Sequence, residues 1–250
     1  MPTYIVYDPK IKVKTRYLTK EVAFFLGGIY AAKESVISNG KIYWAAPVRY
    51  NPKYSTVAET AEHFDVICSI SATVGGYTVM KENIKGTSLD SGKNRLPGFS
   101  TFFESTGLTD LHAEIPSLKA ALLASSKEVQ KAFIIAVIDG RGTPDASVPK
   151  GIIRYLSLDC PDNDIGDFLS EIMENYGLSI NYNTARDRLE GGNPRKPQLR
   201  IKDVENYMKN LGYISPAKTR KLQEVYNVKY GHSRIDRDDA FLKGLKYLKG

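Results

Sequence analysis

The stretch Lys131-Ala-Phe-Ile-Ile-Ala-Val-Ile-Asp-Gly-Arg-Gly142 decides the fold of this chain. It is an apolar run that predicts a helix. The run ends abruptly in a small polar cluster bounded by glycines. A related run, Glu21-Val-Ala-Phe-Phe-Leu-Gly-Gly-Ile-Tyr-Ala-Ala-Lys-Glu-Ser35, occurs earlier in the chain. Two such runs predict two similar halves.

The composition indicates a folded protein. A chain of 250 residues with 42% hydrophobic residues can bury a proper core. The apolar run 22–32 is too short to cross a bilayer, and residues 1–4 lack the features of a signal peptide. We therefore expect a soluble protein of the cytoplasm or an organellar matrix, neither secreted nor held in a membrane. Cys68 and Cys160 are the only cysteines and are expected to be reduced core thiols.

The positive charge is concentrated near the carboxyl end. Residues 181–250 hold 16 Lys and Arg against 8 Asp and Glu, whereas residues 1–180 hold 19 against 20. A basic region on a near-neutral body favours a polyanionic partner, most simply nucleic acid. A merely soluble basic surface is the alternative.

Hydrophobic periodicity predicts the same order of elements twice. After a lead-in of residues 1–18, the first half (19–125) has expected helices at 19–32, 55–73 and 108–124, and expected strands at 41–50, 77–80 and 99–103. The second half (126–230) has helices at 129–138, 165–176, 204–211 and 216–226, a loop at 140–150, and strands at 151–159, 178–184 and 197–202. A basic tail, 231–250, follows. His63, in the second helix, is expected to be a partly buried polar residue rather than a metal ligand.

The repeated run resembles the motif of the LAGLIDADG homing-endonuclease family. It can be laid over Leu26-Gly-Gly-Ile-Tyr-Ala-Ala-Lys-Glu34 and over Ile134-Ile-Ala-Val-Ile-Asp-Gly-Arg-Gly142. The resemblance implies an α+β fold of two αββαββα repeats, with paired central helices and a saddle of antiparallel sheets on duplex DNA. It also implies a monomer, because one chain supplies both halves. Small residues such as Gly28 and Ala136 would let the two helices pack closely.

The sequence departs from the family at the site of catalysis. Each half of the family normally has an acidic residue at the penultimate motif position, where two carboxylates hold a divalent metal. Those positions fall on Lys33 and Arg141, and a cation would repel Mg²⁺.

Two interpretations follow from this departure. In the first, Glu34 and Asp139, helped by Asp145, ligate Mg²⁺ or another divalent cation, while Lys33 or Arg141 stabilises developing charge on phosphate. The chain would then be a homing- or restriction-type endonuclease. In the second, catalysis is lost, Lys33 and Arg141 hold phosphates, and the chain is a DNA-binding or regulatory protein. Asp139 alone has a further alternative, which is to face the core or cap a turn.

Base recognition is expected from polar side chains on strands and loops. The arginines suit guanine, and Asn or Gln suits adenine. The candidates are Lys41, Tyr43, Arg49, Arg154, Asn181, Asn183, Arg186, Arg188, Arg195, Lys196, Gln198 and Arg200, with Lys218, Arg220 and Lys221 expected to add only nonspecific phosphate attraction.

The sequence gives less support to functions of other classes. A small-molecule enzyme lacks a glycine-rich phosphate loop, a nucleophile elbow and a His/Cys metal set. A protein-interaction scaffold would explain the basic tail, but it would not explain two apolar helices that end in polar clusters.

Overall fold

The computed structural model describes residues 18–31, 35–38, 41–45, 54–73, 77–80, 101–106, 111–184 and 196–230. The elements form two successive αββαββα units, followed by one more helix. Each unit thus has the element order that the family resemblance implies, and the fold is α+β as predicted.

The first unit begins at α1, whose first turn is capped by Thr19: its Oγ1 accepts a hydrogen bond from the Val22 amide at 3.2 Å. The elements of this unit are α1 (Lys20–Ala31), β1 (Ser35–Ser38), β2 (Lys41–Ala45), α2 (Val57–Thr73), β3 (Tyr77–Met80), β4 (Thr101–Thr106) and α3 (Leu111–Leu123).

The second unit repeats this order and is followed by α7. Its elements are α4 (Lys127–Arg141), β5 (Thr143–Ser147), a 3-10 turn (Val148–Lys150), β6 (Ile152–Asp159), α5 (Asn163–Tyr176), β7 (Ile180–Asn183), β8 (Gln198–Ile201) and α6 (Val204–Asn210), and then α7 (Pro216–Tyr230). Helix α5 is bounded by local signals. Asp162 accepts from the Ile165 amide at 2.9 Å, and Gly177 ends the helix with φ of 113°.

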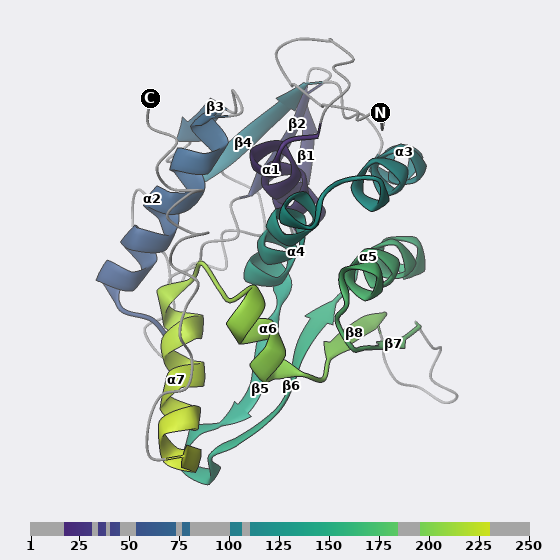
Figure 1. Cartoon of the computed structure of the whole chain (residues 1–250). Coiled ribbons are helices and arrows are strands. Elements are labelled where there is room, and N and C mark those ends of the chain that lie inside the picture. The colour runs from purple at the N-terminus through teal and green to yellow at the C-terminus, as the bar shows by residue number, and fades with distance from the viewer. Residues whose placement is uncertain are drawn as a thin grey trace, which may run out of the picture.

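Both sheets are antiparallel and have the same strand order. The first sheet is ordered β1-β2-β4-β3 and the second β5-β6-β8-β7. Figure 1 shows α1 and α4 side by side between the two sheets, with α2 next to α7 on one flank and α3 next to α5 on the other. The repeated topology means that the chain builds two equivalent faces around one central helix pair.

The central helices approach closely because a glycine lies at their contact. A Cβ atom built on Gly27 would lie 2.5 Å from the Phe133 carbonyl oxygen and 2.9 Å from the Ala136 Cβ. Such distances are well inside van der Waals contact, so only glycine fits. The prediction that small residues permit close helix packing is therefore confirmed for Ala136, and the glycine that lies against it is Gly27 rather than the expected Gly28.

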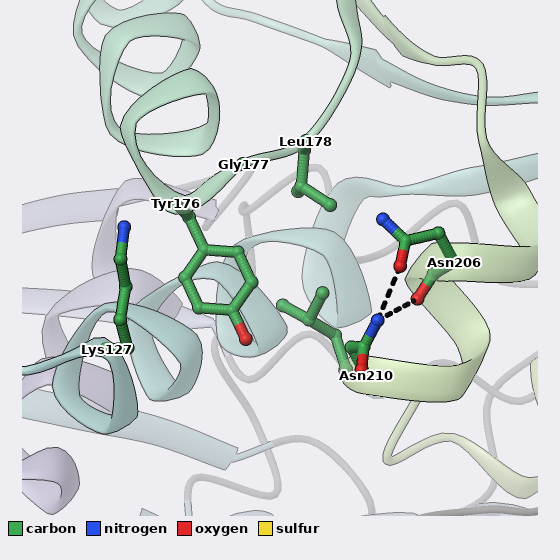
Figure 2. A pocket seen from close by; sticks show the side chains of 7 residues that line it. Lys127, Tyr176, Gly177, Leu178, Asn206 and Asn210 are labelled. Atoms are coloured by element: carbon green, nitrogen blue, oxygen red, sulfur yellow. Dashed lines mark hydrogen bonds between the residues drawn. The ribbon is translucent and has the colours of Figure 1, made fainter.

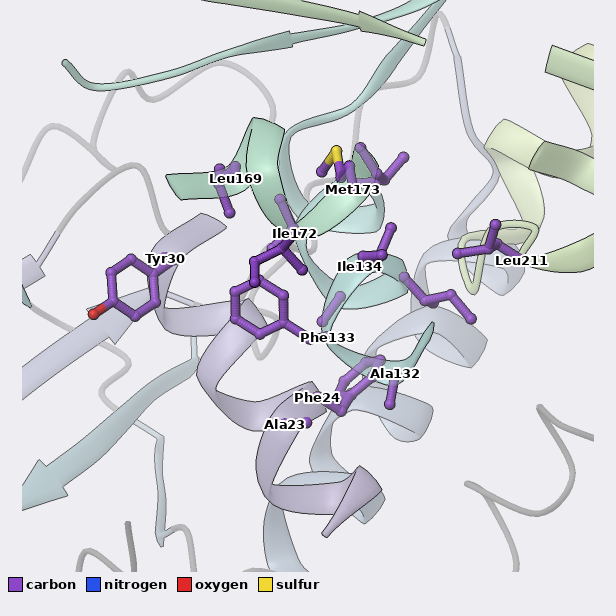
Figure 3. Close-up of a cluster of buried hydrophobic side chains, with 14 of the residues drawn as sticks. Ala23, Phe24, Tyr30, Ala132, Phe133, Ile134, Leu169, Ile172, Met173 and Leu211 are labelled. Carbon is purple, nitrogen blue, oxygen red and sulfur yellow. The ribbon is translucent and has the colours of Figure 1, made fainter. Parts of the chain in front are cut away.

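The core continues from this helix pair to the neighbouring helices (Figure 3). Tyr30 of α1 packs its ring edge-on against Phe168 of α5, with ring centroids 5.3 Å apart, and both rings contact Phe133 of α4. Because α1 belongs to the first unit and α5 to the second, this aromatic cluster joins the two halves into one core.

Three sequence predictions need correction. Residues 35–38 and 143–147 form β1 and β5, although no strand was expected at 35–38 and 140–150 was expected to be a loop. Both are edge strands, and such positions tolerate a residue like Pro144, which offers no amide hydrogen. The last strand of the first sheet is Thr101–Thr106 rather than 99–103. Where the structure describes them, the other expected helices and strands agree to within a few residues; residues 46–50 of the expected strand 41–50 lie outside the described residues.

Candidate nucleic-acid interface

The second sheet has one apolar face and one polar face. Leu156 and Leu158 of β6 and Leu199 and Ile201 of β8 are buried against the helices. Because side chains alternate along a strand, the residues between them point away from this core. We call this outer surface of β5 to β8 the polar face.

Strand pairing arranges the polar face in rows. Ser157 pairs with Arg200, which pairs in turn with Asn181. In the next row Asp159 pairs with Gln198, which pairs with Asn183. Four predicted DNA-binding residues, Asn181, Asn183, Gln198 and Arg200, therefore lie together, and each is half-buried rather than free in solvent.

Arg200 is held by two neighbours on this face. Its Nε donates to Gln198 Oε1 at 2.7 Å, and its guanidinium carbon lies 4.7 Å from the centroid of the Tyr155 ring. Gln198 in turn donates from Nε2 to Asp159 Oδ1 at 2.9 Å. A stacked and hydrogen-bonded guanidinium has little rotational freedom, so this arginine presents a defined edge.

Arg154 reaches the surface through an irregularity in pairing. Tyr155 pairs with Asp145 and Ile153 pairs with Ala146, so Arg154 is an additional residue in β6. Such a β-bulge interrupts the alternation of side chains and can redirect one of them. Arg154 Nη1 lies 3.3 Å from Asp145 Oδ1, with 63% of the arginine side chain exposed.

Asp139 lies inside the protein instead of at an open site. Its side chain has no exposed surface; Oδ2 is 2.5 Å from His63 Nε2, and Oδ1 accepts from the Ser215 amide at 2.8 Å. Lys218 Nζ also donates to the Asp139 main-chain oxygen. Burial by itself would raise the pKa of Asp139, but His63, Lys218 and the Ser215 amide together lower it to about 2. This placement agrees with the alternative in which Asp139 faces the core.

His63 is likewise a buried polar residue, as the sequence indicated. Its partner is a carboxylate from the other half of the chain, which no local pattern around His63 could reveal.

Arg141 is the last residue of α4 and is half-buried. Its Nη1 donates to the Asp159 main-chain oxygen at 3.2 Å, which ties the end of the helix to the end of β6. Burial lowers the pKa of Arg141, and Cys160, Asp159 and Asp162 act in the opposite direction. A cation at a helix C-terminus is also favoured by the helix dipole.

The described residues at the end of α4 do not fit a magnesium ion. Mg²⁺ requires carboxylate or other oxygen ligands with room for bound water. Both Asp139 oxygens are engaged inside the core, and Arg141 brings a positive charge. Within the described ranges, no three His, Cys, Asp or Glu side chains are grouped so that they could hold a metal ion.

The other predicted site residues are only partly placed. Lys41 and Tyr43 lie on β2, but their side chains are outside the described part of the structure, as are Lys33, Glu34, Arg49, Arg186, Arg188 and Arg195. Lys196 is exposed just before β8.

The basic residues of α7 join elements of the protein to one another. Besides the Lys218 contact with Asp139, Arg220 Nε donates to Glu59 Oε1 of α2 at 2.7 Å. Lys221 Nζ donates to the Pro144 oxygen of β5 at 3.4 Å. Helix α7 therefore links the second sheet to the first half.

Sequence reasoning did not select Tyr155 or Asp159. A signal for them exists, because the alternation that buries Leu156 and Leu158 places Tyr155, Ser157 and Asp159 on the opposite side of β6. Attention to that alternation would have placed both residues on the polar face.

A recess on the helical side is a second candidate site (Figure 2). It has a volume of about 260 Å³ and lies at the start of α4, the end opposite Arg141. The Lys127 ammonium lies 5.5 Å from the centroid of the Tyr176 ring and donates to the Asn175 oxygen. Asn210 Nδ2 donates to the Asn206 oxygen at 3.1 Å. The recess gathers none of the residues selected from the sequence, whereas the polar face gathers Asn181, Asn183, Gln198 and Arg200, so the polar face is the stronger candidate. The lining residues are Lys127, Tyr176, Gly177, Leu178, Asn206, Asn210 and Leu211.

Within the described part of the chain, no helix combines the length and the apolar character needed to cross a membrane.

Comparison with known proteins gives structural likeness without sequence relatives. No protein-family model and no curated protein matches the sequence. The crystal structure of full-length DUF199/WhiA from Thermatoga maritima is similar with a TM-score of 0.49 and 10% identity, over 96% of this chain and 70% of that one. The N-terminal LAGLIDADG domain of DUF199/WhiA gives a TM-score of 0.47 and 9% identity, over 89% and 93%. The structure of I-DmoI in complex with DNA and Mn gives a TM-score of 0.43 and 11% identity, over 77% of this chain and 97% of that one.

Proposed function

We propose that this chain is a monomer that binds double-stranded DNA in a sequence-selective way through the polar face of its second sheet. The observation that carries the proposal is the chemistry of that face. One side of the sheet packs against the core, and the other presents amide, hydroxyl, carboxylate and guanidinium groups on paired strands. The residues are Ser157, Asp159, Asn181, Asn183, Gln198 and Arg200.

The dimensions of the sheet suit duplex DNA. Neighbouring strands lie about 4.8 Å apart, so a pair of strands can enter a major groove that is about 12 Å wide. Guanine and adenine present acceptors and donors on that edge, and the side chains of the polar face carry the complementary groups. The repeated topology offers a second, equivalent sheet for the same duplex.

The balance of charge supports selective rather than purely electrostatic binding. Arg154 and Arg200 are accompanied on the polar face by Asp145 and Asp159. Carboxylates repel phosphates but can accept a hydrogen bond from cytosine. A surface built only for phosphate would carry unopposed Lys and Arg.

Binding without cleavage is the form of the proposal that the described residues favour. At the end of α4, Arg141 stands where the family resemblance calls for an acid, and Asp139 is engaged by His63 and Ser215. We assign Arg141 a contact with phosphate. Metal-dependent cleavage, as a homing- or restriction-type enzyme, stays a prediction of the resemblance and rests on Glu34 and Lys33, which lie outside the described residues.

The test is selection from a library of random DNA duplexes, scoring retained and cut molecules with EDTA, Mg²⁺ or Mn²⁺. We expect retention of a sequence family at moderate salt and no cutting in any buffer. The double variant Arg200→Ala/Asn181→Ala should lose selection. Lys209→Ala, which removes an exposed positive charge from α6, should keep it. Absence of retention at low salt would overturn the proposal, and cutting would assign the chain to the nuclease class instead.

A further inference from the structure

We propose that Arg200 reads a guanine and that Tyr155 and Gln198 are the residues that position it. The inference rests on the proposed function and deepens it, because it names one base and one side chain. It concerns the contacts among Tyr155, Arg200, Gln198 and Asp159 on the polar face.

The geometry leaves one edge of the Arg200 guanidinium for a ligand. Gln198 Oε1 accepts from Nε at 2.7 Å, which occupies the side edge of the group. The guanidinium carbon lies over the Tyr155 ring, 4.7 Å from the ring centroid. Among the residues that the structure describes, none accepts a hydrogen bond from the two Nη atoms of Arg200. Two parallel N–H groups of this kind match the O6 and N7 acceptors of guanine.

Two observations favour a base edge over a phosphate. Arg200 lies on β8, an inner strand flanked by β6 and β7, whereas a duplex seated on the sheet brings its phosphates to the rims of the groove. The carboxylate of Asp159 also accepts a hydrogen bond from Gln198, which itself accepts one from Arg200. A nearby negative charge disfavours phosphate but not the edge of a base.

Gln198 is a positioning residue in this arrangement. Reading adenine would require both ends of its amide. Here Oε1 accepts from Arg200 and Nε2 donates to Asp159 at 2.9 Å, so both ends are used inside the protein. The sequence-based expectation that Gln198 pairs with adenine is replaced by a role in orienting Arg200.

Arg154 supplies a comparison on the same face. Its Nη1 lies 3.3 Å from both carboxylate oxygens of Asp145. One of the two terminal nitrogens that would read guanine is therefore engaged by a carboxylate. An arginine held in this way does not read a base, and its replacement by lysine should change no base preference.

The experiment measures base preference and salt dependence together. Selected duplexes and their single-base variants are titrated by fluorescence anisotropy with wild type, Arg200→Lys, Arg154→Lys and Lys209→Ala. Arg200→Lys should lower the preference for guanine at one position by roughly 10- to 100-fold. The salt dependence should not change, because the charge is kept. Arg154→Lys and Lys209→Ala should keep that preference.

Two further variants test the positioning roles. Tyr155→Phe keeps an aromatic ring under the guanidinium and should keep the guanine preference, whereas Tyr155→Leu should reduce it. Gln198→Ala should reduce it as well, at unchanged salt dependence. Circular dichroism and urea unfolding establish that each variant is folded, so a loss of preference cannot be a loss of structure.

The outcomes separate this inference from the proposed function. If wild type selects DNA but Arg200→Lys keeps the same guanine preference, the role of Arg200 is overturned while DNA binding stands. The same holds if Arg200→Lys loses equal affinity for every duplex. Absence of any guanine preference in the wild type would do the same. A wild-type protein that retains no duplex would remove both proposals.

Discussion

The carboxylate of Asp139 in the second half lies 2.5 Å from the imidazole of His63 in the first half, and both side chains are buried. Tyr30, one residue before the position of α1 that corresponds to Asp139, contacts Phe168 in the second half. Near its C-terminal end, each central helix thus contacts the second helix of the opposite half: α4 contacts α2, and α1 contacts α5. One of these contacts is aromatic and the other is a buried carboxylate–imidazole hydrogen bond, and both join the two halves.

Breaking the contact between Asp139 and His63 should destabilise the protein. Asp139→Asn keeps the size of the side chain but removes the charge that faces His63 and Lys218, and the loss of one member of a buried pair costs about 3 kcal/mol. Urea unfolding followed by circular dichroism measures the change. The matched control is Asp145→Asn, which removes a carboxylate from an exposed pair and should cost less than about 1 kcal/mol. Equal effects of the two variants would show that Asp139 does not have the structural role assigned to it.

Asp139 should also make stability depend on acid pH. The folded protein lowers its pKa from 3.8 to about 2, so the unfolded chain binds the proton more readily than the folded one. The stabilisation is therefore complete well above pH 3.8 and is lost as the pH falls toward 2. It amounts to about 2 kcal/mol, since each pKa unit corresponds to about 1.4 kcal/mol. Unfolding free energies measured from pH 6 to pH 2.5 should converge for wild type and Asp139→Asn; curves that stay parallel would contradict the assignment.

Gly27→Ala should separate the central helices. The new Cβ would meet the Phe133 main-chain oxygen at 2.5 Å, and main-chain atoms of a helix cannot move aside cheaply. Overpacking of this kind costs about 1–3 kcal/mol. Gly166→Ala is the matched control, because there the new atom meets the end of one side chain, Tyr182, rather than main-chain atoms of a helix. Thermal unfolding should show the larger loss for Gly27→Ala, and the reverse order would contradict the proposed close approach.

Removal of divalent cations should leave DNA binding unchanged. The proposed contacts are hydrogen bonds from side chains on the polar face, and none of them requires a metal. Affinity for a selected duplex, measured by anisotropy at fixed ionic strength, should agree within about two-fold between EDTA and Mg²⁺, which corresponds to about 0.4 kcal/mol. A larger loss in EDTA would mean that a cation takes part in binding, and the metal-site assignment to Glu34 would then need direct measurement.

Local signals explain why much of the fold could be predicted. Helix α5 follows from its apolar spacing, the Asp162 cap and Gly177. Strands β7 and β8 follow from alternation, and α1 and α4 from their continuous apolar runs. Strand β5 could not be found in this way, because Thr143–Ser147 contains proline and no large apolar residue. The strand is stabilised by its hydrogen-bonded pairing with β6 rather than by an apolar pattern of its own.

The candidate site was predictable in part for the same reason. Alternation placed Arg200, Gln198, Asn181 and Asn183 on strands, and the sheet confirms that these four share one face. It could not show that Gln198 uses both ends of its amide inside the protein, because one of its partners, Asp159, comes from a strand much earlier in the chain.

By itself, the sequence determined the two buried helices, the repeated order of elements and the alternation of the strands, since each depends on neighbours within a few residues. Only the tertiary structure decided what the polar end of Lys131–Gly142 does. Asp139 turns toward His63, Ser215 and Lys218, while Arg141 reaches the end of β6. These partners are distant in sequence, and a buried carboxylate is stable only where such partners converge on it.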